Sequence, residues 1–236
     1  MNRRSFLLTL PVAVVPGVVL AQIKGNRAPS RDPILEHIAR ESARIQSDFR
    51  RRGIRSELLA ALSSNLRLGA AYGKEHDIDR VIQNAARQVS RDRFIAYQRD
   101  HDMREHSKAE IARQFPGLEI DAPALPVAAT DDQYESALSL MQANGGFVFL
   151  HERLAQITSE VAAKLERYAK LEGGAVIRPV QVDECYLYQN ALMIARMMAD
   201  AICLFSAFDP MLLPVCAVIQ IEVWTAQILV WWYCGF

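Results

Sequence analysis

Residues 183–236 decide how the C-terminal part of the chain folds: DECYLYQNALMIARMMADAICLFSAFDPMLLPVCAVIQIEVWTAQILVWWYCGF. All four cysteines of the chain lie here, and Cys185 and Cys203 are separated by 18 positions, as are Cys216 and Cys234. Because 18 steps of about 100° complete five whole turns of an α-helix, the two cysteines of each pair share one side of a helix. The spacing therefore predicts two helices, each of which carries two cysteines on the same side, one near each end.

The dipeptide Asp209-Pro210 interrupts the apolar run and predicts a turn between these helices. Two cysteines on one helix are about 27 Å apart, too far for a disulfide. In an antiparallel hairpin, facing residues have numbers with a constant sum, and Cys185 with Cys234 gives the same sum as Cys203 with Cys216. One register therefore predicts both disulfides. The alternatives are ordinary buried thiols and a zinc site, which the absence of short CxxC-like steps disfavours.

The outer surface of the hairpin is also apolar, since Asp209 and Glu222 are the only charged residues from 201 to 236. A helix that is apolar all round is buried in its own core, in a protein partner or second copy of the chain, or in lipid. A membrane span over 211–233 would place Glu222 near its centre, at a cost of about 3 kcal/mol. Burial in the core is therefore favoured, an interface comes next, and lipid contact last.

The rest of the sequence also predicts helices, and the fold class is all-α, a multi-helix bundle ending in the antiparallel, disulfide-stapled hairpin. Asp32-Pro33 combines an N-cap residue with a proline at the first helical position. Thr130 and Gln133 have the spacing of a capping box. The predicted helices run from Asp32 to Gly53, from about Leu58 to Gly73, from Asp77 to about Gln114, from Thr130 to Ala143 and over 147–171, with a short extended crossover at 175–182.

The first 21 residues, MNRRSFLLTLPVAVVPGVVLA, have the layout of an export signal: positive residues, a short apolar run, and small residues before a cleavage site between Ala21 and Gln22. Arg3-Arg4 followed by Phe6-Leu7 resembles the twin-arginine (Tat) signal of bacteria. The resemblance is confined to this segment, and no family is recognised for the mature chain. It implies passage of a folded protein into the bacterial periplasm, or secretion, sometimes with a cofactor already bound.

Composition is that of a globular protein, with 236 residues, 51% of them apolar, and 27 basic residues balancing 27 acidic ones. This neutrality gives no support for nucleic acid as a partner. The chain divides into the signal at 1–21, a tether at 22–31, a basic helical region at 32–115, a proline-rich linker at 116–130 and an acidic and apolar helical region at 131–236. The opposite charges of the two halves indicate mutual packing, or else a basic face for an anionic partner.

Candidate metal ligands are sparse. On one continuous helix, His101 would lie over Glu105 and Asp102 over His106. His101 and His106 diverge by about 140° there, so a solvated face with local ion pairs is favoured over a shared metal ion. Met193 and Met197 are weak candidates for copper, because thioethers are soft ligands, but methionine more often fills a core.

Catalytic motifs are not found. His151-Glu152 lacks the second histidine of HExxH, and Arg196 and Asp200, one helical turn apart, are interpreted as a partly buried pair. The expected function is that of an exported bacterial envelope protein acting as a non-catalytic structural or binding module. Two alternatives remain: a metal- or cofactor-loaded periplasmic redox protein, drawing on residues such as His151, and a membrane-associated factor that uses the hairpin.

Overall fold

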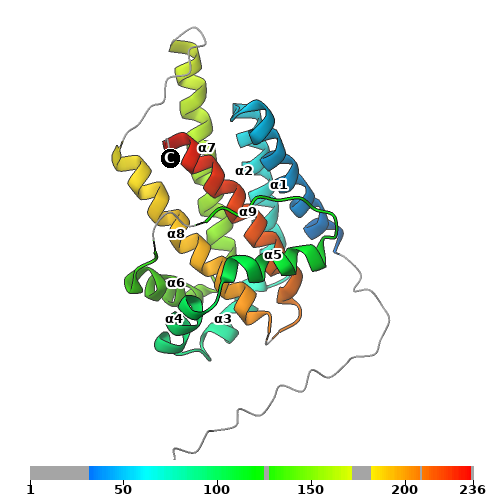
Figure 1. Ribbon diagram of the computed structural model, residues 1–236, viewed down its shortest axis with the longest axis vertical. Coiled ribbons are helices and arrows are strands. Elements are labelled where there is room, and N and C mark those ends of the chain that lie inside the picture. The colour runs from blue at the N-terminus through cyan, green and yellow to red at the C-terminus, as the bar shows by residue number, and fades with distance from the viewer. Residues whose placement is uncertain (1–31, 125–127, 172–181, 208, 235–236) are drawn as a thin grey trace, which may run out of the picture. The chain divides into compact units, whose positions relative to one another are not determined.

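The computed structural model describes residues 32–124, 128–171, 182–207 and 209–234, which belong to one compact unit. Within these residues the structure is all-α and has no strand. The helices are α1 (Pro33–Arg52), α2 (Ser56–Glu75), α3 (Ile78–Ala86), α4 (Arg91–Asp100), α5 (Met103–Gln114), α6 (Asp131–Asn144), α7 (Phe147–Leu171), α8 (Val182–Phe205) and α9 (Leu212–Cys234) (Figure 1). The signal segment, the tether and most of the predicted crossover at 175–182 lie outside the described residues.

The hairpin has the predicted register. α8 and α9 lie side by side and are joined by Cys185–Cys234 and Cys203–Cys216, with Cα–Cα distances of 5.7 and 4.7 Å. The pairing follows from the equal spacing of the sulfurs on two antiparallel helices. The hairpin is therefore closed at both ends by covalent bonds.

α9 is the central helix of the unit and contacts α1, α5, α7 and α8 (Figure 1). It is long and apolar enough to cross a membrane, but 83% of its most apolar window is buried among the other helices. Glu222 in its middle is fully buried. The favoured prediction, burial in the protein's own core, is thus what the described unit shows.

Local capping signals explain several helix ends. The Asp32 side chain accepts hydrogen bonds from the backbone N–H groups of Ile34 and Leu35, and Gly53 ends α1 at a φ of 70°. Thr130 and Gln133 form the predicted capping box of α6. Polar side chains at these positions satisfy N–H groups that have no partner within the helix.

The long helix predicted from Asp77 to Gln114 is wrong, because the chain bends twice and forms α3, α4 and α5. Ser90 and His101 have extended backbones, and Asp102 caps α5 through the N–H of Glu105. The bends let Phe94 and Met103 both reach the core, which a straight rod would not allow. Tertiary burial here outweighs the local helical pattern.

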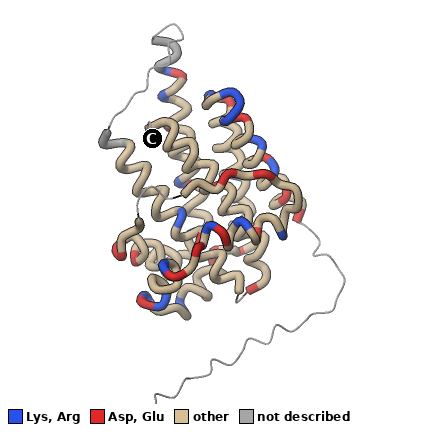
Figure 2. The backbone as a smooth tube through the Cα atoms, viewed as in Figure 1, with Lys and Arg blue, Asp and Glu red and all other residues tan. Residues whose placement is uncertain are grey.

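Ion pairs connect the basic first half with the acidic second half. Arg91 pairs with Glu135 and Lys74 with Glu152, both at 2.7 Å; further pairs join Arg50 to Asp121 and Arg99 to Asp131. Figure 2 shows charged residues of both signs spread over the outer helices, whereas the hairpin carries few. The two halves thus meet in part through opposite charges.

Candidate functional site

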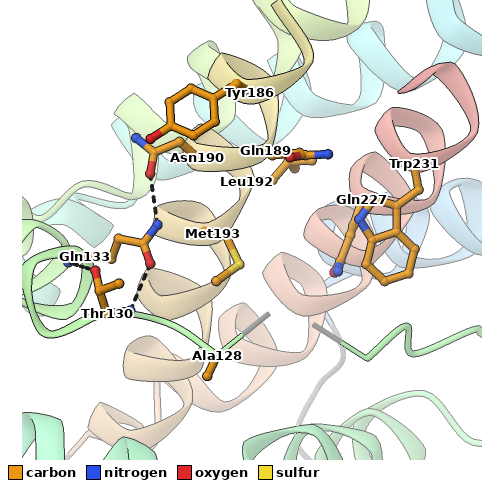
Figure 3. Close-up of a pocket in the computed structure, with 10 residues that line it drawn as sticks. All are labelled: Ala128, Thr130, Gln133, Tyr186, Gln189, Asn190, Leu192, Met193, Gln227 and Trp231. Atoms are coloured by element: carbon orange, nitrogen blue, oxygen red, sulfur yellow. Dashed lines mark hydrogen bonds between the residues drawn. The ribbon is translucent and has the colours of Figure 1, made fainter. Parts of the chain in front are cut away.

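One face of α8, facing the start of α6 and the end of α9, lines a cavity of about 200 Å³ (Figure 3). We call it the amide cavity because amide side chains dominate its polar lining. It holds no Asp, Glu, Lys, Arg or His among its described lining residues, which are Ala128, Thr130, Gln133, Tyr186, Gln189, Asn190, Leu192, Met193, Gln227 and Trp231. Its chemistry is therefore that of an uncharged, amphipathic site.

The α6 wall of the amide cavity is fixed by hydrogen bonds. Gln133 accepts from the backbone N–H of Thr130 at 3.0 Å and donates to the side-chain oxygen of Asn190 at 2.9 Å (Figure 3). The capping box of α6 thus extends to α8. These amides are oriented before any ligand arrives.

Gln227 of α9 differs from the other amides because it is buried while one of its polar atoms has no partner among the described residues. Its side chain is 3% exposed, and its Nε2 donates to the carbonyl of Ala124 at 3.4 Å. Its Oε1 is buried with no hydrogen-bond partner among the described residues. A buried acceptor without a partner costs about 1–3 kcal/mol, so a donor placed in the cavity would be bound favourably.

The apolar part of the amide cavity comes from both helices of the hairpin. Leu192 and Met193 of α8 lie across from Trp231 of α9 (Figure 3). Met193, a weak copper candidate from the sequence, thus lies beside a tryptophan and amides. No group of three or more His, Cys, Asp or Glu side chains that could hold a metal occurs in the described part of the chain.

The other metal candidates are separated by the bend between α4 and α5. His101 ends α4, where its ring stacks on Tyr97 with centroids 3.8 Å apart. The predicted stacking of His101 over Glu105 on one helix is wrong, because the helix breaks between them. Glu105 pairs instead with Lys108 at 2.7 Å, and His106 is exposed.

Arg196 and Asp200 form the predicted pair, with Arg196 Nε 3.3 Å from each carboxylate oxygen. The pair is more deeply buried than predicted, at 3% and 6% exposure. Gln220 of α9 donates to Asp200 at 2.6 Å. Met197, the second weak copper candidate, follows Arg196 on α8 and is buried.

A second buried pair, His151 with Glu222, was missed by the sequence interpretation. His151 Nε2 lies 2.7 Å from Glu222 Oε2, and His151 Nδ1 lies 2.8 Å from the Phe147 carbonyl. Burial opposes protonation of the ring, but Glu222 outweighs it and raises the pKa of His151 above 6.5. Burial raises the pKa of Glu222 above 4.5, and the hydrogen bond from His151 offsets only part of that rise. Both shifts favour keeping a proton on the pair.

The signals for the missed residues are weak but visible in the sequence. His151 falls on the packing stripe of 147–171, four residues after Phe147, and Glu222 and Gln227 are polar positions in an apolar run. Which helix each one meets depends on three-dimensional packing. The predicted cleavage site at Ala21 and Gln22 lies outside the described residues.

Comparisons of the chain with protein-family models, with curated proteins and with solved structures found no match.

Proposed function

We propose that the protein is an exported bacterial envelope protein that acts as a non-catalytic binding module, with the amide cavity as its ligand site. The Arg3-Arg4 signal and the cleavage pattern before Gln22 support export. Two disulfides within one hairpin are typical of proteins that mature in an oxidising compartment.

The observation that carries the proposal is the buried, unpartnered Oε1 of Gln227 in an otherwise apolar and amide-lined cavity. Such a combination favours a small neutral molecule that has an apolar body and one hydrogen-bond donor. The volume of about 200 Å³ lies below the usual range of about 300–1,000 Å³ for small-molecule sites. The ligand is therefore fragment-sized, or one portion of a larger molecule enters.

The test uses benzyl alcohol as the probe, because it joins an aromatic ring to a hydroxyl donor. In spectra of the ¹⁵N-labelled oxidised protein, we expect benzyl alcohol to shift the indole signal of Trp231 and the side-chain amide of Gln227. Toluene lacks the donor and should bind about five- to tenfold more weakly, the equivalent of one hydrogen bond of about 1 kcal/mol.

The matched variants are Gln227→Met, which keeps the length of the side chain but removes the acceptor, and Gln156→Met on the exposed face of α7. We expect Gln227→Met to abolish the preference for benzyl alcohol over toluene, and Gln156→Met to leave it unchanged. If neither probe shifts Trp231 at millimolar concentration, or if the preference survives in Gln227→Met, the proposal is wrong.

A further inference from the structure

Beyond the amide cavity, the same face of α8 continues into a second cavity of about 300 Å³, which we call the arginine cleft. Arg196, Met197 and Asp200 line it from α8. His101, Asp102 and Arg104 line it from the junction of α4 and α5. Unlike the amide cavity, this cleft is charged.

The guanidinium group of Arg196 is held in place from two sides. Asp200 accepts from its Nε, and the central carbon of the group lies 5.0 Å from the ring centroid of Trp224. Asp200 is itself fixed by the hydrogen bond from Gln220. An arginine oriented in this way loses little side-chain entropy when it binds a further acceptor.

The hydrogen bonds of Arg196 to described residues all come from Nε, so neither of its terminal nitrogens has an acceptor among them. Arg196 is 3% exposed, and its Nη1 has no hydrogen-bond partner among the described residues. A buried guanidinium N–H group without an acceptor is costly, more so than a neutral donor. An acceptor that enters the cleft would relieve this cost.

The other side of the cleft favours an acceptor that carries a negative charge. Met103 and Arg104 form the first turn of α5, whose N-terminus is already capped by the Asp102 carboxylate, so the cationic group on this side is the Arg104 side chain and not the helix end. The Arg104 guanidinium is half-buried and lies 3.6 Å from the Glu105 carboxylate, a distance that makes only a loose ion pair. Asp102 and Asp200 limit how much negative charge the cleft accepts, because a dianion would be repelled by both carboxylates.

We infer that the arginine cleft is a binding site for a small monocarboxylate, with Arg196 Nη1 as its buried donor and Arg104 at its second cationic side. This inference is independent of the proposed function, since it concerns other residues and an anionic acceptor ligand, whereas the amide cavity takes a neutral donor. A carboxylate matches the planar donor edge of an arginine, and a hydrogen bond from a guanidinium to a charged acceptor is stronger than one to a neutral acceptor.

The experiment titrates the oxidised protein with benzoate and, separately, with inorganic phosphate at pH 7.5, following the Arg196 Nε–H and Trp224 indole signals. We expect benzoate to shift both signals saturably, and phosphate, largely a dianion at this pH, to bind at least tenfold more weakly. Benzyl alcohol should shift Trp231 but leave the Arg196 signal unchanged. Failure of one site is therefore distinguishable from failure of the other.

Two variants test the residues. Arg196→Met combined with Asp200→Asn removes the donor without leaving a buried carboxylate unpaired, and should weaken benzoate binding at least tenfold. Arg104→Gln, at a partly exposed position where folding is not at risk, should weaken it about threefold, whereas Arg93→Gln on the exposed surface of α4 should have no effect. Tighter binding of phosphate than of benzoate, unchanged binding in both test variants, or benzoate shifts confined to Trp231 would each overturn the inference.

Discussion

His151 and Glu222 form a buried pair that holds a proton inside the core. Both side chains are fully buried, and Glu222 Oε1 has no partner among the described residues. The His151 ring also packs against Gly69 of α2, where an added Cβ would come within 2.3 Å of the ring. The pair is therefore confined by backbone on one side and has no room to reorganise.

The proton on this pair makes stability depend on pH. Since the pKa of His151 is raised above 6.5 in the folded state, the folded protein binds more protons than the unfolded chain above that pH. The free energy of unfolding should then fall as pH rises above 6.5 towards the raised pKa of His151, by up to about 1.4 kcal/mol per pH unit. Urea unfolding at a series of pH values measures this slope.

The control for that slope is the double variant His151→Gln with Glu222→Gln, which keeps two polar groups in contact but cannot titrate. Its free energy of unfolding should be nearly independent of pH over the same range once any slope common to both proteins is subtracted. Parallel pH profiles in the two proteins would show that the pair does not carry the effect.

The sequence predicted one of the two buried pairs and missed the other, for a physical reason. Arg196 and Asp200 are four residues apart on one helix, so helical geometry alone brings them together. His151 and Glu222 are 71 positions apart. Their contact depends on how α7 packs against α9, which no local pattern specifies. Gln227 and its cavity were missed for the same reason.

Among the helices, the α8–α9 hairpin has the most predictable geometry, and its two disulfides should contribute unequally. Cys203–Cys216 closes a loop of 13 positions and Cys185–Cys234 one of 49. The chain-entropy relation gives about 3 kcal/mol for the short loop and about 4 kcal/mol for the long one. Replacing either pair by two alanines should lower the free energy of unfolding by about these amounts.

Denaturant unfolding under oxidising conditions measures those losses. In the presence of a reductant that opens both bonds, the difference in loop entropy between the wild type and each variant should disappear, leaving only the effect of the smaller side chains. Losses that persist unchanged under reduction would mean that packing, not the covalent link, carries the stabilisation.

The bends at Ser90 and His101 mark the limit of helix prediction from this sequence. Ser90 and Asp102 favour helix N-termini, yet both residue types also occur inside helices, and the apolar positions around them keep a helical spacing. The choice between a rod and three short helices is made by the burial of Phe94, Met103 and Ile111. At capped ends such as Asp32 and Thr130, the decisive contacts lie within a few residues, and the prediction is confirmed.

For the whole molecule, the remaining prediction concerns export. If the first residues act as a twin-arginine signal, Arg3→Lys with Arg4→Lys should leave the precursor in the cytoplasm, because that route reads the arginine pair itself. Fractionation of the producing bacterium, with the N-terminus of the exported form determined at Gln22, measures the outcome. Arg27→Lys with Arg31→Lys, in the predicted tether, provides the charge-matched control.

Periplasmic protein recovered in normal amount from the double lysine variant would exclude the twin-arginine route and leave general secretion. The distinction matters for the hairpin, since a twin-arginine substrate folds in a reducing cytoplasm before its disulfides form. The extensive buried core around α9 is consistent with a fold that forms before the disulfides do.

The central place of α9 has a consequence for biosynthesis. The inner faces of α1, α5, α7 and α8 all meet a helix that is translated after every one of them. α1 and α7 also pack on α2, but a nascent chain that has not yet reached Leu212 lacks the helix that covers the rest of these apolar faces. Completion of the core must therefore wait until α9 has emerged from the ribosome, and until then the exposed apolar surface of the growing polypeptide favours aggregation.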